Sequence, residues 1–556
     1  MKKKKWTLWS ILCFTGIPWF IIGAGGGIYF KVWYHNNYSR IPFVINGIAD
    51  VKDILLYAFL FMLFVFLFNT MHLSDSKPIG LFTWLSKYRY EPPEISPRKR
   101  KAQHPPIDNY LLSKEPEGLV LGKYHKYFVR VPIKKGNIQN MILMGAPGCG
   151  KSVLLLTTLL YQLAYKIKNK IKDSMTFYCI DIKPELAMKS CRIKGNKRVK
   201  VMNPVDRSTY GWDPYYRLNK DSTPDDIMAE LDVIARALID AGKGEKNEFF
   251  YESARTIMKA VLFYTYKNGR SFMQGLDYLM NENISTLVAK TIEKTENKPE
   301  YRLVSKLLKP YEGKQGEAFE GIELAFRQSL SCFTTQMVQF FLDGNPRKAS
   351  PNDLENKVSV FFSIPETKID EYKCLLRLVT MQIMQHCSGR SEDSHMLTLV
   401  IDEAARLGSI NWVNFLATSR SRQCATILAF QSYSQMQTCW SKEEAKSLFE
   451  LCRIVAVLSC TDPDTARMMS EWAGSYKEEK QSHNNGGKND GSYSISYEDK
   501  KILEPVDIMT LQDTNEILLF IKGKYYRTDV AGARYFNIKP LNELSKLCVA
   551  LNRKER

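Results

Sequence analysis

The chain has 556 residues, of which 45% are hydrophobic and 25% charged, and this composition excludes a disordered or fibrous protein. Its formal net charge of +19 suits a partner with negative charge, such as nucleic acid or anionic lipid, although a lysine-rich background composition would also produce it. The twelve cysteines are scattered, without a Cys-x-x-Cys pair or a Cys/His cluster at metal spacing, which excludes a zinc module and favours reduced thiols in a cytosolic compartment.

Residues 1–75 are predicted to form a membrane anchor with two transmembrane helices, at about 6–30 and 54–73. The first run has no charge over 25 residues, which is enough helix to cross about 30 Å of hydrocarbon. Lysines precede the first run, and lysines and arginines follow the second, so the positive-inside rule places both ends in the cytoplasm. A cleaved signal peptide is the alternative for 6–30, but the run is longer than a signal core and lacks a small-x-small cleavage site.

A chain of this length is expected to fold as about three or four units. Residues 76–110 follow the anchor as a basic cytoplasmic linker. Within it, the basic, proline-rich stretch 90–106 is predicted to lie beside lipid headgroups.

A phosphate-binding loop follows a short apolar run at 140–144 and precedes a helical pattern that starts at Val153. Its residues are Gly145, Ala146, Pro147, Gly148, Cys149, Gly150, Lys151 and Ser152. The spelling GxxxxGK[ST] between a strand and a helix predicts an ATP site, because glycines let backbone N–H groups surround phosphate oxygens at the positive end of the helix. We expect Lys151 to reach the β- and γ-phosphates and Ser152 to ligate Mg²⁺.

A second acidic site is predicted at Asp402 and Glu403, which follow the apolar run 396–401. A run this short indicates a buried parallel strand, and active sites gather at the C-terminal ends of such strands. Asp402 is expected to hold the Mg²⁺ shell, and Glu403 to polarise the attacking water, which favours a hydrolase over a kinase. The alternative is a core strand that merely ends in two solvated acids.

Another strand-like run, 426–430, ends at Gln431, an amide expected to sense the γ-phosphate. Upstream of it, Arg420 or Arg422 is predicted to supply positive charge to the transition state of a neighbouring subunit, as arginine fingers do. Either arginine is also compatible with an ordinary surface charge.

Between Lys151 and Asp402 there are far more residues than one strand–helix–strand unit needs, which predicts an inserted domain. Residues 220–350 are interpreted as all α-helical, because a proline-led helix start at 223–226 is followed by apolar residues at helical spacing. Further helices are expected at 248–267 and 317–342.

The last part of the chain is predicted to return to the nucleotide-binding fold. It contains a strand at 453–458, a helix start at 462–464 and a closing hairpin-like element at 517–526. Residues 481–494, rich in Asn, Gly and Ser, are expected to form a mobile surface loop.

With these motifs, the chain resembles the type IV secretion coupling proteins, the TraG/TraD-type ATPases of conjugation. The likeness covers nearly the whole chain and includes the two N-terminal spans and the loop 145–152. The other matching segments are Ile180-Asp181-Ile182-Lys183-Pro184-Glu185-Leu186, Trp212-Asp213-Pro214, Asp402-Glu403 with the following residues to Ile410, and Gln431-Ser432-Tyr433-Ser434-Gln435. The chain departs from the family at Ala404, where an aromatic is usual, and at Asp213, which replaces Asn.

The resemblance implies an α/β fold: a RecA-like P-loop domain formed by residues 111–219 and 351–556, interrupted by the all-α domain 220–350. It implies a hexamer in the bacterial inner membrane, with both termini and the ATPase domain cytoplasmic. The implied partners are single- or double-stranded DNA, relaxase and relaxosome proteins, and type IV secretion channel proteins. Position in the family motif favours Arg420 over Arg422 as the finger. The chain ends without the long acidic tail that some relatives use to recruit cargo.

Three other functions compete with a DNA-transfer motor. A channel-assembly ATPase would hydrolyse ATP without touching DNA, and an ATP-gated docking receptor would bind nucleotide with negligible turnover. A cell-division DNA translocase is disfavoured, since those proteins carry four spans and a separate DNA-reading domain.

Overall fold

The computed structural model describes Phe59 and most of residues 106–554. The gaps within that range are residues 133–138, 172–174, 191–197, 241–247, 315, 409, 484–492 and 522. The chain divides into two compact units, residues 1–99 and 100–556, and all the elements named below lie in the second. Within the described part, no helix is long and apolar enough to cross a membrane. Apart from Phe59, the predicted spans lie outside this part and stay predictions.

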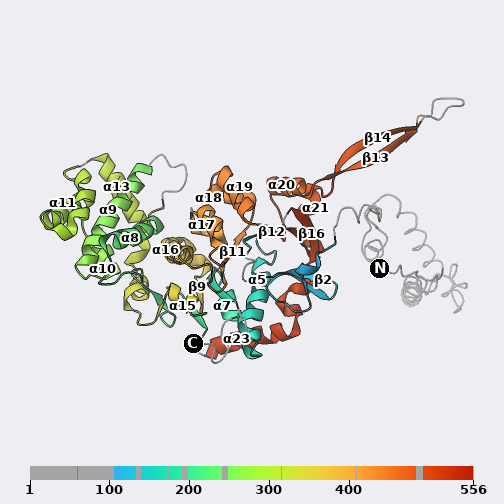
Figure 1. Cartoon of the computed structure of the whole chain (residues 1–556), viewed down its shortest axis with the longest axis horizontal. Coiled ribbons are helices and arrows are strands. Elements are labelled where there is room, and N and C mark those ends of the chain that lie inside the picture. Colours follow the sequence, from blue (N-terminus) through green and yellow to red (C-terminus); the bar gives the residue numbers. More distant parts are fainter. Residues whose placement is uncertain are drawn as a thin grey trace, which may run out of the picture. The chain divides into compact units, whose positions relative to one another are not determined.

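A twelve-stranded sheet forms the centre of the second unit (Figure 1). Seven neighbouring strands are parallel, in the order β12 (Ile454–Val457), β4 (Met141–Met144), β11 (Cys424–Phe430), β10 (Leu397–Ile401), β5 (Thr176–Asp181), β9 (Ser359–Ser363) and β6 (Val199–Met202). An antiparallel group continues the sheet beyond β12, in the order β15 (Glu516–Ile521), β16 (Lys524–Asp529), β2 (Leu119–Tyr124), β3 (Tyr127–Val131) and β1 (Leu112–Ser113).

The parallel strands are buried along their whole length, except for the edge strand β6, and they are mostly apolar because both faces of the sheet are covered. In β4, Ile142 and Met144 belong to one hydrophobic core, whereas Met141 and Leu143 belong to another. This alternation follows from the period of two in a strand, which sends successive side chains to opposite faces. The α/β fold class predicted from the sequence is therefore confirmed.

Helices cover each face of the sheet. The core that contains Met141 also includes residues of α5 (Lys151–Leu159), its π-helical continuation Leu160–Tyr165, α7 (Glu185–Ser190) and α23 (Lys539–Lys554). The core that contains Ile142 includes residues of α8 (Pro224–Leu238), α16 (Ile369–Ser388), α17 (Trp412–Ser419), α18 (Tyr433–Cys439), α19 (Lys442–Leu451) and α20 (Pro463–Ala473). The short helices α15 (Pro351–Glu355), α21 (Pro505–Met509) and α22 (Leu511–Thr514) each add one residue to the core that contains Ile142. The remaining short helix is α6 (Lys166–Lys168).

Between β7 (Gly211–Trp212) and β8 (Lys348–Ala349), which pair in parallel, the described chain is helical. The helices α9 (Glu248–Lys267), α10 (Phe272–Met280), α11 (Ile284–Thr295), α12 (Arg302–Leu308) and α13 (Glu317–Leu330) gather together (Figure 1). At the start of α8, the side chain of Thr223 accepts from Asp226 N–H and the Asp226 carboxylate accepts from Thr223 N–H, a reciprocal cap. The boundaries 220 and 350 of a separate domain stay a prediction.

The continuous helix expected over 317–342 is wrong. The helix α13 ends at Leu330, and a 3-10 turn, Ser331–Thr334, precedes the short helix α14 (Gln336–Gln339) and a π turn, Phe340–Gly344. The break has a local cause: Thr335 adopts an extended backbone and its hydroxyl accepts the Val338 N–H at 3.4 Å, which starts a new helix.

Strands β13 (Ser475–His483) and β14 (Tyr493–Lys501) form a two-stranded antiparallel ribbon that extends from the end of α20 (Figure 1). The loop expected over 481–494 is therefore too long at both ends, because residues 481–483 and 493–494 lie in strands. The closing hairpin expected over 517–526 is confirmed as β15 and β16.

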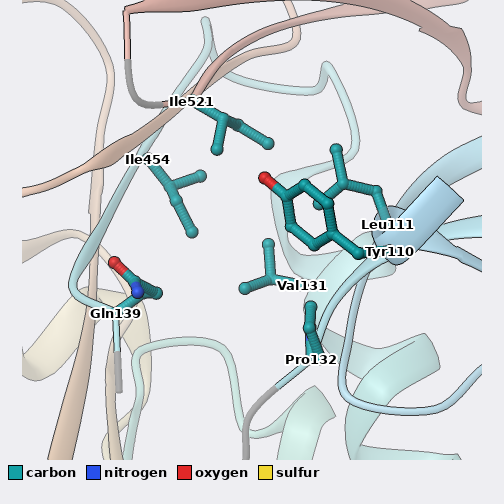
Figure 2. Close-up of a pocket in the computed structure, with 7 residues that line it drawn as sticks. All are labelled: Tyr110, Leu111, Val131, Pro132, Gln139, Ile454 and Ile521. Atoms are coloured by element: carbon teal, nitrogen blue, oxygen red, sulfur yellow. The ribbon is translucent and has the colours of Figure 1, made fainter. Parts of the chain in front are cut away.

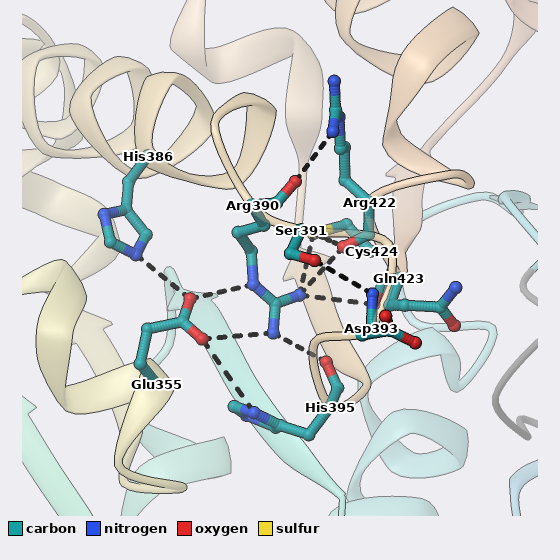
Figure 3. A network of polar contacts seen from close by, with 9 residues as sticks. All are labelled: Glu355, His386, Arg390, Ser391, Asp393, His395, Arg422, Gln423 and Cys424. Atoms are coloured by element: carbon teal, nitrogen blue, oxygen red, sulfur yellow. Dashed lines mark hydrogen bonds and ion pairs between the residues drawn. The ribbon is translucent and has the colours of Figure 1, made fainter.

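A buried guanidinium joins the segments that lead into β10 and β11 (Figure 3). The Arg390 side chain is 2% exposed, and its Nε donates to Glu355 Oε1 at 2.8 Å. Its Nη2 donates to the carbonyl of His395 at 2.6 Å, and its Nη1 donates to the carbonyl of Arg422 at 3.1 Å. Because β10 begins after His395 and β11 after Arg422, this one side chain fixes where both strands start.

The Glu355 carboxylate completes the network. Its Oε1 also lies 3.1 Å from His386 Nε2 at the end of α16. The hydrogen bond to His386 and the pairing with Arg390, opposed by partial burial, lower the pKa of Glu355 to about 2. Glu355 therefore stabilises the fold as a charged group.

Replacing Glu355 with Gln should lower the melting temperature of the full-length protein most strongly near neutral pH. The pKa of the Glu355 carboxyl falls from 4.5 to about 2 on folding. Its charge therefore contributes its full stabilisation above pH 4.5, and this contribution is lost as pH falls toward about 2. When melting temperatures are measured between about pH 7 and pH 3, the difference between Glu355→Gln and wild type should become smaller below about pH 4.5. Glu392→Gln is the matched control, because it removes an exposed carboxylate from the loop after α16, and its melting temperature should differ little from that of wild type. A gap for Glu355→Gln that does not change with pH would contradict this account.

Candidate nucleotide-binding site

The loop 145–150 joins the end of β4 to the start of α5, at the C-terminal edge of the parallel strands. Gly148 and Gly150 have φ values of 80° and 100°, in the left-handed region that favours glycine. At position 145 glycine is favoured for another reason, because a Cβ there would lie 2.4 Å from Cys149 Sγ. The loop is held from the side by Ser459, whose Oγ accepts the Ala146 N–H at 2.9 Å.

Lys151 is the first residue of α5, and its side chain is buried. The ammonium group turns back into the loop and donates to the carbonyl of Gly145, with a longer contact of 3.5 Å to the carbonyl of Ala146. A buried ammonium beside the free N–H groups of a helix start is suited to phosphate oxygens.

Ser152 and Asp402 meet across 250 residues of sequence. Asp402 follows the last residue of β10, and Ser152 Oγ donates to its Oδ2 at 3.3 Å. Burial and the neighbouring charge of Glu403 raise the pKa of Asp402 to about 6, against the lowering effects of Lys151 and Ser152. A hydroxyl and a buried carboxylate beside a phosphate loop are oxygen ligands of the kind that Mg²⁺ prefers, so the residues present fit the ion expected from the sequence.

Asp181 adds a carboxyl that the sequence interpretation gave no role in the site. It ends β5, the strand next to β10, and is fully buried. Its Oδ2 accepts from Ala187 N–H at 2.8 Å and from Ser363 Oγ at 3.2 Å, whereas Oδ1 has no partner in the described part of the chain. Burial, with a smaller effect of Asp402, raises the pKa of Asp181 to about 7. The signal in the sequence was an acid at the end of a buried strand, the same signal that identified Asp402.

Glu403 is held in a left-handed backbone conformation, with φ 63° and ψ 58°. A non-glycine residue keeps such a conformation only where its surroundings enforce it, and these residues cluster at active sites. Its Oε1 accepts from Gln431 Nε2 at 2.5 Å and from Gln435 Nε2 at 2.9 Å. The contact with Gln431 arises because β11 pairs with β4 on one side and with β10 on the other, which places the residue after β11 beside both acids.

The two candidate arginines do not join this cluster. Arg420 and Arg422 lie before β11, whereas Gln431 lies after it, and seven strand residues separate the two edges by about 23 Å. Arg422 Nη1 donates to the carbonyl of Arg390 at 3.0 Å, within the network of Figure 3. Burial, with the nearby charge of Arg453, lowers the pKa of Arg420. The structure therefore brings together Lys151, Ser152, Asp402, Glu403 and Gln431, and places Arg420 and Arg422 at the opposite edge of the sheet.

A cavity of about 20 Å³ lies far from this chemistry (Figure 2). It is lined by Tyr110, Leu111, Val131, Pro132, Gln139, Ile454 and Ile521. Ile454 begins β12, and Gln139 precedes β4, so the cavity lies at the N-terminal edge of these parallel strands. A mostly apolar space about the size of one water molecule does not suit a nucleotide.

Several known proteins are similar to this chain in sequence. Residues 396–513, which contain Asp402, Glu403, Gln431 and the β13–β14 ribbon, match the family described as the TraM recognition site of TraD and TraG. The type IV secretion system-coupling protein VirD4 of Bartonella quintana (strain Toulouse) is 22% identical over 371 residues, or 62% of this chain and 56% of that protein. VirD4 of Bartonella henselae is 22% identical over 368 residues, with the same coverage. The chain is therefore similar in sequence to type IV secretion coupling proteins.

Solved coupling proteins share the fold. The bacterial conjugative coupling protein TrwBdeltaN70, in an unbound form, has a TM-score of 0.57 at 18% identity, over 75% of this chain and 89% of that chain. TrwB in complex with ADP and Mg²⁺ has a TM-score of 0.56 at 17% identity, over 75% and 90%. The mixed α/β fold of this chain is therefore that of TrwB, a protein that has been solved with ADP and Mg²⁺. The chain matches about 56% of the length of its VirD4 relatives.

The raised pKa of Asp402 predicts that Mg²⁺-dependent nucleotide binding weakens as pH falls through about 6. Protonation of this carboxyl competes with the metal, so the affinity for a fluorescent, non-hydrolysable ATP analogue should drop between about pH 7.5 and pH 5.5. Asp402→Asn should bind weakly, with little dependence on pH. Glu403→Gln removes the neighbouring charge that raises the pKa of Asp402 and should move the drop to lower pH. An unchanged pH dependence in Asp402→Asn would show that another group controls it.

Proposed function

We propose that this protein is a type IV coupling protein: a membrane-anchored, ATP-hydrolysing motor and substrate receptor, which delivers relaxase–DNA and protein substrates to a type IV secretion or conjugation channel. The observation that carries the proposal is the position of Glu403. It stands next to Asp402, is held by the amide of Gln431, and is linked through Asp402 and Ser152 to the phosphate loop. A binding-only receptor does not require a carboxylate at this position.

Each residue has a separate task in this proposal. The loop N–H groups and Lys151 bind the phosphates of ATP, while Ser152 and Asp402 hold Mg²⁺, which neutralises charge on the phosphates. Glu403 accepts a proton from the water that attacks the γ-phosphate, and Gln431 contacts that phosphate. The left-handed backbone of Glu403 keeps its carboxylate aimed into this edge of the sheet.

The position of Arg420 supports a ring of subunits. An arginine on the opposite edge of the sheet, about 23 Å from its own Gln431, cannot reach its own phosphate loop. It is suited to the loop of a neighbouring copy, where its charge would stabilise the transition state. We propose a homo-hexamer with Arg420 as the trans-acting finger, because its position in the motif that the chain shares with coupling proteins favours it over Arg422.

Membrane, DNA and partner assignments rest on the sequence and the family. We propose that residues 6–30 and 54–73 anchor the chain in the bacterial inner membrane with the ATPase domain cytoplasmic. The net charge of +19 is compatible with single- or double-stranded DNA as a substrate. The description of residues 396–513 supports recognition of a TraM-like relaxosome partner by this part of the chain.

The purified full-length chain should hydrolyse ATP, and Lys151→Ala should reduce turnover at least about 100-fold, because it removes the buried charge that binds the transferred phosphoryl group. Phosphate release measures this directly. Lys446→Ala, at an exposed lysine of α19, provides a control for loss of a lysine in general. Turnover that is unchanged in Lys151→Ala would overturn the motor, and wild-type protein that binds ATP without turnover would favour the docking receptor.

Single-stranded DNA should stimulate ATP turnover, and the stimulation should fall steeply as salt rises from about 50 to 200 mM, since phosphate contacts release counterions. An unrelated polyanion such as heparin, at equal charge, controls for general electrostatic binding. If the protein hydrolyses ATP but binds no DNA even at low salt, the channel-assembly ATPase becomes the better description.

A further inference from the structure

The carboxylate of Glu403 is held by two amides rather than one. Gln431 Nε2 and Gln435 Nε2 both donate to the same atom, Oε1, at 2.5 and 2.9 Å. Within the described residues, Oε2 of Glu403 accepts no hydrogen bond. The two donors therefore fix the rotation of the carboxylate and leave one oxygen for another ligand.

The orientation of the Gln435 amide is set by the backbone. Its Oε1 accepts the Gln431 N–H at 2.9 Å, so its NH₂ group is the part that faces Glu403. The assignment of oxygen and nitrogen follows from this pair of contacts, because the reversed amide would place an NH₂ group against the Gln431 N–H. Gln435 thus makes contacts with both Gln431 and Glu403 through one planar group.

The helix that carries Gln435 is itself anchored. The side chain of Ser432 caps α18 by accepting the Gln435 N–H at 3.1 Å. One residue before Gln435, Ser434 Oγ donates to Asp462 Oδ2 at 2.8 Å, at the N-terminal cap of α20. Met436, the next residue, is completely buried. A side chain meant to position another needs such support, since its own movement would be transmitted to the group it holds.

The two glutamines are not equivalent. Gln431 lies at the end of β11, directly between the phosphate loop and the acids, and is the residue that we propose contacts the γ-phosphate. An amide NH₂ that turns to a phosphate leaves Glu403 Oε1. Gln435, one turn into α18, keeps its contact because its own oxygen is tied to the backbone.

We propose that Gln435 is the positioning residue that keeps the Glu403 carboxylate directed at the attacking water while Gln431 engages the γ-phosphate. This inference rests on the proposed hydrolytic function. In the resting site both amides hold Glu403, and in the nucleotide-bound site Gln435 holds it alone. The proton of the attacking water passes to Oε2, the oxygen that neither amide occupies.

The test uses the full-length chain and separates turnover from binding. Gln435→Met keeps the length of the side chain and removes both the NH₂ group that holds Glu403 and the oxygen that accepts the Gln431 N–H. We expect kcat to fall about 10-fold or more, a part of what a general base contributes. The affinity for a non-hydrolysable ATP analogue should stay at the wild-type value, and the melting temperature should fall only slightly, since one hydrogen bond to a backbone N–H is lost. Gln437→Met makes the same change at another glutamine of α18, one that has no hydrogen bond to the site in the described part of the chain, and as the matched control it should leave kcat and nucleotide affinity unchanged.

Combined substitutions distinguish the partner of Gln435. In a Glu403→Ala background, Gln435→Met should cause no further loss of turnover, because the group that it positions is gone. In a Gln431→Met background it should still lower kcat. The proposal is overturned if Gln435→Met leaves kcat unchanged or raises it, or if kcat, nucleotide affinity and melting temperature all fall together, which would indicate a purely structural role. Wild-type protein without any turnover would overturn the proposed function and this inference together, whereas normal turnover in Gln435→Met would overturn this inference alone.

Discussion

The candidate site depends on the parallel pairing of three strands that are distant in sequence. β11 lies between β4 and β10, in a register that aligns Phe430 with Met144 and Leu428 with Ile401. This register places the phosphate loop, Gln431 and the two acids at one edge of the sheet. The hydrogen bond between Ser152 and Asp402 closes the arrangement. A slip of one residue in β10 would turn Asp402 to the other face of the sheet and separate it from the loop.

Burial gives this edge its chemical character. Asp181 and Asp402 are removed from water, so both carboxyls have a raised pKa and hold their protons more tightly than exposed acids. Such a site accumulates unfavourable charge when empty, and a bound cation would relieve it. At the opposite edge, the charge of Arg390 is compensated, since its guanidinium contacts the Glu355 carboxylate and three backbone carbonyls. The fold thus places its structural ion pair and its chemical site at opposite ends of the same strands.

Much of this arrangement could be predicted from the sequence because each strand has a recognisable apolar pattern. The short apolar runs before Gly145, Asp402 and Gln431 predicted buried parallel strands, and the loop spelling predicted its own conformation. The order of the strands in the sheet could not be predicted from the sequence. For this reason neither the contact of Glu403 with Gln431 nor the burial of Asp181 could be predicted. The break at Thr335 was missed for a different reason, since the apolar pattern continues through a residue whose hydroxyl starts a new helix. Gln435 was quoted as part of a motif, but its role follows only from the geometry of its amide.

The account makes Glu403 the group that converts nucleotide binding into hydrolysis, and one substitution tests this directly. Glu403→Gln keeps the size of the side chain and removes its ability to accept a proton. We predict that this protein binds the ATP analogue as tightly as wild type while its turnover falls at least about 100-fold, so that ATP is trapped uncleaved on the enzyme. Turnover close to that of wild type in Glu403→Gln would contradict the central claim, because the carboxylate beside Asp402 would then have no part in the chemistry.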